Sequence, residues 1–269
     1  YLRFLARLVR AQQQAAGTVQ TAAPDPALIA QAQEHSMALL PAAQHIDPAW
    51  QGVLDQLLAA LDGAPELPEA LRPTLARLRA LSGEERDALA RRVLIGLLGD
   101  SADLAAAPIV MAALQVVFAD RASRLQESDI PYTDPATICP VCGTAPVASV
   151  LRIGGREAGL RYLHCGCCGT EWHMVRVKCS HCESTKGVHY QGLQSEGSDQ
   201  KDEVVLAETC DQCHTYRKIA NQEKDPLAEP LADDLATLLL DLLMGETPFA
   251  RASMNPLLPM AEAEESPAP

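Results

Sequence analysis

The sequence is poor in aromatic and in basic residues, and each shortage excludes a class of protein. Phe, Trp and Tyr together make up 4% of the 269 residues, while Ala and Leu are abundant, so helical packing is favoured over a β-sandwich or barrel. Lys and Arg number 22 against 35 Asp and Glu, a net charge of −13. Even residues 139–213 carry seven basic side chains against nine acidic ones. Because a nucleic-acid-binding surface has to be positive, we expect no nucleic acid as a partner.

The sequence also lacks an uncharged stretch long enough for a membrane-spanning helix. Within the part of the chain that has helical periodicity, the longest such stretch runs from Leu104 to Ala119, 16 residues, and it contains Pro108. A spanning helix needs about 20 consecutive apolar residues. We therefore predict no membrane insertion, and we expect this stretch to form a buried helix that Pro108 begins or kinks.

Helical periodicity dominates residues 1–130. Asp25 and Asp47 are each followed by proline, which places a capping acceptor before a first helical position that needs no N–H donor. Ser82 and Glu85 have the spacing of a capping box. Leucines recur at helical spacing between these signals, at Leu54, Leu57, Leu58, Leu61, Leu71, Leu75, Leu78 and Leu81. These patterns predict an all-helical domain of about six helices.

The sequence changes character after a proline-bearing linker at residues 128–137. All nine cysteines lie between Cys139 and Cys213, and an odd number in paired spacing favours metal ligation in a reducing compartment over disulfides. Short β-branched runs at residues 148–153 and 174–178 predict small strands in this part of the chain.

A further helix is predicted after the cysteines. Asp225 and Pro226 are expected to open it, and Pro230 to mark a kink or its true start. Leucines are expected to supply its buried face, at Leu235, Leu238, Leu239, Leu242 and Leu243. This C-terminal helix and tail occupy residues 223–260, and the acidic, proline-bearing residues 261–269 are expected to be disordered.

The cysteines form four C-x-x-C pairs, Cys139/Cys142, Cys165/Cys168, Cys179/Cys182 and Cys210/Cys213. Two intervening residues let a tight turn direct both sulfurs at one tetrahedral ion. The gaps of 22 residues between the first two pairs and 27 between the last two suit hairpins that bring the turns together. This favours sequential pairing into two four-thiolate sites, while a crossed pairing, first with third and second with fourth, stays open. Cys167 is expected to be a spare small residue, with a redox or alternative ligand position as the rival interpretation.

The predicted fold is therefore α+β. The helical domain is followed by a first rubredoxin-like or zinc-ribbon-like module at residues 138–178, a second at residues 179–222, and the C-terminal helix. A closed four-sulfur shell leaves no coordination position for a substrate, so metal-assisted hydrolysis is disfavoured and no enzyme is expected. Thiolate sites accept both iron and zinc, and the residues alone leave the choice open.

Several motifs resemble those of bacterial formate dehydrogenase accessory proteins, the FdhE family. The resemblance rests on Cys139–Gly143, Arg161–Cys165, Glu171–His173, Val175–Cys182, Cys210–Cys213, Glu223–Pro226, Ala232–Leu235 and Arg251–Pro256. It covers about residues 138–259, with weaker support from Tyr1–Phe4. Met254 and Leu257-Leu258 depart from the aromatic or β-branched residues expected there, and Cys167 is a second departure.

The resemblance implies a cytoplasmic, chaperone-like assembly protein, without enzymatic activity, that respiratory formate dehydrogenase needs to become active. It implies binding of the dehydrogenase catalytic subunit, with the eight paired cysteines holding two metal ions, iron favoured and zinc possible. An iron redox protein that acts during maturation of the dehydrogenase is the alternative. The candidate partner contacts are Glu171, Trp172, His173, Asp233, Asp234, Arg251 and Asn255.

Overall fold

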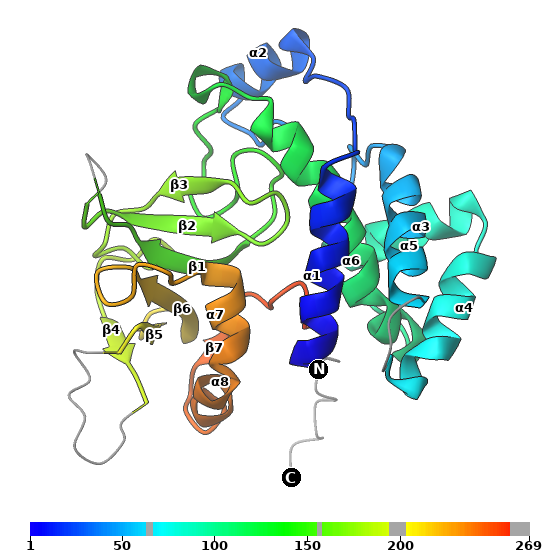
Figure 1. Ribbon diagram of the computed structural model, residues 1–269. Coiled ribbons are helices and arrows are strands. Elements are labelled where there is room, and N and C mark those ends of the chain that lie inside the picture. The colour runs from blue at the N-terminus through cyan, green and yellow to red at the C-terminus, as the bar shows by residue number, and fades with distance from the viewer. Residues whose placement is uncertain (63–66, 155–157, 194–202, 259–269) are drawn as a thin grey trace.

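The computed structural model describes residues 1–62, 67–154, 158–193 and 203–258, and the tail expected to be disordered lies outside them. Helices gather in the N-terminal half and strands in the C-terminal half, so the α+β prediction is confirmed (Figure 1). The helices of the first half are α1 (Leu2–Ala16), α2 (Pro26–Glu34), α3 (Ala49–Asp62), α4 (Arg72–Ala80), α5 (Gly83–Ile95) and α6 (Ser101–Ser123). Short 3₁₀ turns lie at Glu69–Leu71 and Glu127–Asp129.

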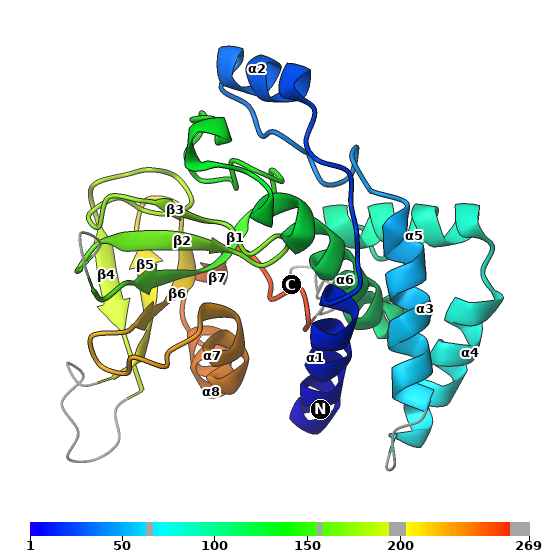
Figure 2. The same ribbon diagram turned by 45° about the horizontal axis from the view of Figure 1, so that its top comes forward.

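Helix α6 is the centre of the helical domain. Its residues from Ala106 to Phe118 are buried, and α1, α3, α4 and α5 all contact it (Figures 1 and 2). By length and composition α6 could cross a membrane, but 78% of its most apolar window is buried inside the protein, as in the core helix of a soluble fold. The predicted buried helix is therefore confirmed.

Of the two alternatives predicted for Pro108, that it begins the helix or that it kinks it, the first is wrong. The helix begins at Ser101, because the Asp100 side chain accepts a hydrogen bond from the Asp103 amide over 2.7 Å and caps the first turn. Pro108 lies inside the helix. A proline there forfeits one backbone hydrogen bond, a cost that the buried apolar side chains on both sides of it offset.

The predicted caps elsewhere in the domain are confirmed. Asp25 accepts from the Ala27 amide over 2.9 Å, and Asp47 accepts from the Ala49 amide over 3.0 Å. Ser82 and Glu85 form a reciprocal capping box at the start of α5. These local signals therefore set where three of the helices begin.

The C-terminal half is built on one sheet. Its strands are β1 (Pro146–Leu151), β2 (Arg161–Cys165), β3 (Glu171–His173), β4 (Val188–Gln191), β5 (Val205–Cys210), β6 (Thr215–Asn221) and β7 (Ala250–Arg251). The strand order is β3-β2-β1-β6-β5-β4, and β7 lies beside β6. The strand predicted at residues 174–178 is wrong: the Lys178 amide donates to the Val175 carbonyl in a turn that leads the chain from β3 to the third cysteine pair.

Strands β1 and β6 join the two cysteine modules. They pair in parallel, with Ser149 opposite Ile219 and Leu151 opposite Asn221, whereas the pairs β1–β2, β2–β3, β4–β5 and β5–β6 are antiparallel. The two modules expected from the sequence therefore share one continuous sheet.

The C-terminal helix is two short helices, α7 (Pro230–Ala236) and α8 (Leu238–Met244). The Glu229 side chain caps α7 by accepting from the Ala232 amide over 2.6 Å, so Pro230 is the true start and the start at Asp225 is wrong. A break at Thr237 changes the direction of the helical face, so Leu240 packs on the sheet with Tyr216 and Met244. The buried face predicted for three leucines of α8 is therefore wrong: Leu239 is 58%, Leu242 71% and Leu243 45% exposed.

Candidate metal centres

The first and second cysteine pairs form one sulfur cluster. The Sγ atoms of Cys139, Cys142, Cys165 and Cys168 all lie within 4.8 Å of one another. The closest approaches are Cys142 to Cys165, at 3.4 Å, and Cys139 to Cys168, at 3.5 Å. The first pair lies on the loop before β1, and the second begins at the end of β2, so the β1–β2 hairpin brings them together.

The third and fourth pairs form a second cluster in the same way. The sulfurs of Cys179, Cys182, Cys210 and Cys213 also lie within 4.8 Å of one another. Cys179 and Cys213 approach to 3.7 Å, and Cys182 and Cys210 to 3.8 Å. The grouping is sequential, the arrangement favoured from the lengths of the gaps, and the crossed arrangement is wrong.

All four turns share one backbone geometry. In the first, the Cys139 carbonyl accepts from the Gly143 amide over 2.9 Å, and the residue after the second cysteine has a positive φ. Glycine supplies that conformation in the first cluster, at Gly143 (φ 73°) and Gly169 (φ 74°). In the second cluster Glu183 (φ 58°) and His214 (φ 52°) adopt it with a side chain attached.

The donors fit a tetrahedral metal ion. Bonds of about 2.3 Å to four sulfurs at tetrahedral angles keep the sulfurs about 3.8 Å apart, and the observed close approaches are 3.4–3.8 Å. Backbone amides of the turns also point at sulfur, over 3.4 Å from Cys168 to Cys165 and 3.3 Å from His181 to Cys179. Such amides partly offset negative charge on thiolates. Two four-sulfur sites that could each hold a soft metal ion are therefore present, and the donor set suits iron and zinc.

Burial disfavours the ionised, thiolate form of two of these cysteines. Loss of hydration raises the pKa of Cys139 and of Cys179, because a buried thiolate is poorly solvated. A bound metal ion reverses this balance by stabilising the thiolate directly. Cys139 and Cys179 are therefore favoured as thiols without metal and as thiolates with it, whereas hydrogen bonds from Cys139 and the other neighbouring cysteines lower the pKa of Cys142.

Three threonine hydroxyls that were not predicted from the sequence contact the sulfurs. The Thr144 hydroxyl lies 3.1 Å from the Cys142 sulfur and 3.2 Å from the Cys165 sulfur. Thr170 and Thr215 lie 3.1 Å from the sulfurs of Cys168 and Cys213, respectively. The signal was available, because a Ser or Thr stands two positions after the second cysteine of every pair, at Thr144, Thr170, Ser184 and Thr215.

Cys167 is buried beside the first cluster without belonging to it. Its backbone amide donates to the Cys165 sulfur over 3.4 Å, and its side chain is 3% exposed. The Cys142 sulfur and burial raise the pKa of the Cys167 thiol. This placement agrees with a spare small residue that packs as a neutral thiol.

The candidate partner contacts near the second pair lie at the edge of the sheet. Glu171 forms an ion pair with Arg152 and a hydrogen bond with Nδ1 of His164, 2.9 Å away. Trp172 is half-buried and donates from Nε1 to the Ala136 carbonyl over 2.8 Å. His173 is exposed, so of this group it presents most side-chain surface to solvent. Their contact with a partner stays a prediction.

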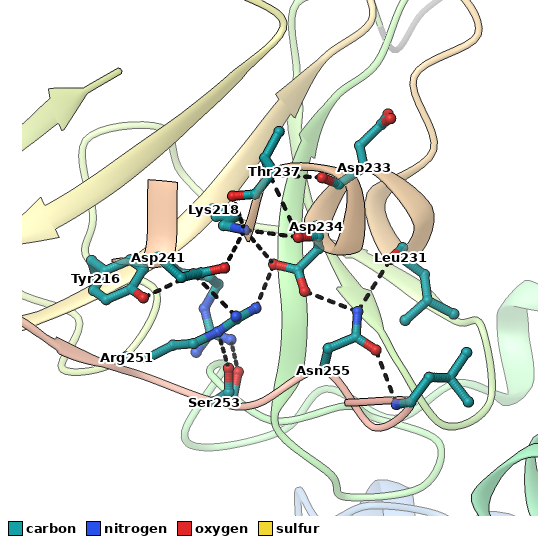
Figure 3. Close-up of polar contacts among 12 residues, drawn as sticks. Tyr216, Lys218, Leu231, Asp233, Asp234, Thr237, Asp241, Arg251, Ser253 and Asn255 are labelled. Carbon is teal, nitrogen blue, oxygen red and sulfur yellow. Dashed lines mark hydrogen bonds and ion pairs between the residues drawn. The ribbon is translucent and has the colours of Figure 1, made fainter. Parts of the chain in front are cut away.

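Three of the four candidate contacts in the C-terminal part, Asp234, Arg251 and Asn255, meet in a buried polar network (Figure 3). Asp234 pairs with Arg251 and accepts from the Asn255 amide over 2.9 Å, and the Lys218 ammonium lies 3.6 Å away. Asp241 also pairs with Arg251 and with Lys218. The network ties α7 and α8 to β6 and β7.

Burial argues against partner contact through this network. Asp234 is 1% and Asn255 is 0% exposed, and the Arg251 side chain is 11% exposed. Asp234 therefore does not lie on a solvated helix face, and its charge is compensated inside the fold. Asp233 is half-buried at the surface and accepts from the Glu229 amide over 2.7 Å.

Comparison with protein families gives three consecutive matches. The family "FdhE, N-terminal" matches residues 1–134, "FdhE, central domain" matches residues 138–176, and "FdhE, C-terminal domain" matches residues 177–258. The central match contains the first cysteine cluster. The C-terminal match contains the second cluster together with α7 and α8.

Individual relatives agree with these matches. The chain is 42% identical over 224 residues to a protein FdhE homolog of Cronobacter sakazakii, covering 81% of this chain and 68% of the relative. It is 45% identical over 214 residues to a homolog of Edwardsiella ictaluri, covering 78% and 66%, respectively. The crystal structure of the FdhE protein from Pseudomonas aeruginosa superposes with a TM-score of 0.83 at 38% identity, over 96% of this chain and 88% of that one. The chain therefore belongs to the FdhE family.

Proposed function

We propose that this chain is a cytoplasmic accessory protein that respiratory formate dehydrogenase needs to become active, and that it binds the catalytic subunit of the dehydrogenase. Family membership supports the accessory role. In this proposal the chain acts by binding and does not catalyse a reaction, because four thiolates per ion leave no coordination position for a substrate.

The observation that carries the proposed partner contact is the leucine face of α8. Leu239, Leu242 and Leu243 stand at helical i, i+3 and i+4 positions and are 58%, 71% and 45% exposed. Leu240 and Met244, on the other side of α8, pack against the sheet. A grouped apolar surface on a protein with a net charge of −13 indicates a contact site for another protein.

The second cysteine cluster helps to position the leucine face of α8. β6 leads out of the fourth cysteine turn, and its Tyr216 packs on α8. The Tyr216 hydroxyl also donates to Asp241 of α8 over 2.8 Å. Because α8 is held by a strand that begins at the second cluster, loss of that cluster would disturb the leucine face.

The test is anaerobic capture of the catalytic subunit from a lysate that expresses formate dehydrogenase, with the tagged full chain as bait. Leu242→Asp should abolish recovery of the subunit while metal content and thermal unfolding stay unchanged. Leu227→Asp is the matched control, since Leu227 is 87% exposed but lies before α7. Equal recovery with both variants would contradict the leucine face as the contact, and failure of the unmodified chain to recover the subunit would contradict the binding itself.

A second candidate function, an iron redox protein acting during maturation, is favoured by the donors around the sulfurs. Amide and hydroxyl donors to thiolates stabilise the more electron-rich form of a metal centre. The test is the visible spectrum of the iron-loaded protein during reduction and reoxidation. Reversible bleaching would support the redox function, and a colourless zinc protein from cells would count against it.

A further inference from the structure

We propose that the two sulfur clusters divide two tasks: the first holds its metal ion permanently as part of the core, and the second exchanges its ion with external soft ligands through Cys182. The external ligands are of the thiol or chelating-amine class. This inference concerns how the chain's own cysteines retain or release metal and does not depend on the identity of a protein partner.

Burial separates the two clusters. The four cysteines of the first are all buried, with exposures of 0%, 1%, 1% and 3% for Cys139, Cys142, Cys165 and Cys168. In the second, Cys179 and Cys210 are buried, Cys213 is half-buried and Cys182 is exposed. A ligand from solution therefore has access to the second cluster on the side of Cys182.

The first cluster is also held by the helical domain. Three amides of the segment before α3 donate to its first turn: Leu39 to the Pro140 carbonyl, Leu40 to the Val141 carbonyl and Ala42 to the Cys142 carbonyl. From α6, Gln115 donates to the Gly166 carbonyl of the second turn over 2.7 Å. Its cysteines belong to the same apolar cluster as the core of α3 and α6. Opening this site would therefore mean opening the main core.

The Ser and Thr hydroxyls near the sulfurs also differ between the two clusters. In the first cluster the two hydroxyls of Thr144 and Thr170 contact three of the four sulfurs. In the second, Thr215 contacts Cys213, while the Ser184 hydroxyl accepts from the Lys186 amide over 3.1 Å instead of contacting Cys182. Removing such outer contacts typically weakens metal binding about 10–100-fold, and the exposed Cys182 sulfur lacks the hydroxyl contact that Cys213 has.

The backbone beside Cys182 is strained as well. Glu183 has a φ of 58°, a left-handed conformation that is unfavourable for a residue other than glycine. The equivalent position in the first cluster is glycine in both turns, Gly143 and Gly169. Release of the Cys182 sulfur would let Glu183 relax, whereas the first cluster has no such strain to relieve.

The exchange step is a ligand substitution without a change of oxidation state. The incoming thiol forms a bond from its sulfur to the ion as the bond to the Cys182 sulfur breaks, and the proton of the incoming thiol passes to the released Cys182 thiolate. Repetition at Cys213, the half-buried ligand, and then at Cys179 and Cys210 breaks the remaining bonds and hands the ion over. The reverse sequence loads the site.

The test uses the full chain loaded with two equivalents of zinc and an excess of the chromogenic chelator 4-(2-pyridylazo)resorcinol. We expect one equivalent to be released at least about 10-fold faster than the other. Rapid alkylation with iodoacetamide after the fast phase, followed by peptide mass spectrometry, should label Cys182 and Cys213 and spare the first cluster. The alkylation needs no variant, so it gives a result even if a substituted chain fails to fold.

Two variants complete the test. Cys182→Ser should remove the fast equivalent and leave the slow one and the far-ultraviolet circular dichroism unchanged. Cys167→Ser, a thiol outside both clusters, is the matched control and should keep both phases. Release of both equivalents at one rate, or labelling of first-cluster cysteines during the fast phase, would overturn the proposal.

Discussion

The guanidinium of Arg217 donates to the hydroxyl of Ser180 over 3.0 Å and so connects β6 to the third cysteine turn. The same guanidinium contacts the Pro146 carbonyl at the start of β1 and the Ser253 hydroxyl after β7. Burial lowers the pKa of Arg217 to about 10, which leaves it charged at neutral pH. One buried cation therefore links the second module, the first module and the C-terminal segment.

Arg217→Met should lower the free energy of unfolding by about 3 kcal/mol, the range for removing one partner of a buried ionic network. The cause is that Ser180, Pro146 and the nearby Glu208 lose their donor or countercharge. Urea denaturation of the metal-loaded protein measures the change. Lys186→Met, an exposed basic residue in the same module, should change the stability by less than about 0.5 kcal/mol. Equal effects of the two substitutions would contradict the linking role.

Asp233 and Asp234, neighbours in α7, allow a second comparison between a buried and a surface substitution. Asp234→Asn removes the buried charge that compensates Arg251 and Lys218, so we expect a loss of about 3–5 kcal/mol. Asp233→Asn keeps an acceptor for the Glu229 amide at the surface and should cost less than about 0.5 kcal/mol. Thermal unfolding of both variants tests this. A large loss from Asp233→Asn alone would mean that the roles of the two residues are exchanged.

Thr144→Val should weaken metal retention at the first cluster about 10–100-fold while the fold is kept. Valine has nearly the shape of threonine, so the substitution removes the hydroxyl contacts to Cys142 and Cys165 with little change in packing. Competition with a chelator measures the affinity. Thr185→Val, at an exposed position of the second module, should have no effect and serves as the control.

The lowered pKa of Asp103 predicts that the stability of the protein depends on pH. Burial opposes its charge, but the hydrogen bonds from Arg77 and Arg92 prevail and lower the pKa of the Asp103 carboxyl. The stabilisation from its carboxylate is complete above the unfolded-state pKa, about 3.9, and is lost as the pH falls through the lower folded-state pKa. Asp103→Asn should therefore destabilise the protein at pH 7, and its difference from the unmodified chain should shrink toward about pH 3. A difference that stays constant with pH would exclude this origin.

The features that could be predicted from the sequence are those set by interactions between residues close together in the chain. The C-x-x-C turns, the Ser82–Glu85 box and the cap at Asp25 are local patterns of a few residues, and the structure has all of them. The buried helix could be predicted from the uncharged stretch alone. Its start was missed because Pro108 is a strong local signal, whereas the Asp100 cap is a weaker one that tertiary packing reinforces.

The features that could not be predicted depend on distant residues. Asp234 is buried because Lys218 and Arg251, 16 residues before and 17 after it, converge on it. Without those partners a pair of aspartates indicates a solvated surface. The parallel pairing of β1 with β6 joins residues about 70 positions apart, and no turn signal encodes it. The exposed leucines of α8 were missed for a related reason, since the break at Thr237 moved the buried face.

The β1–β6 pairing also has a consequence for how the chain is made. During synthesis β1 leaves the ribosome about 70 residues before β6, and until then one long edge of β1 has no hydrogen-bonding partner. An unpaired edge is a template for pairing with other chains. β1 therefore gains this partner only when the last fifth of the polypeptide begins to emerge, and a ribosome stalled before residue 215 holds a nascent chain with this edge still unpaired.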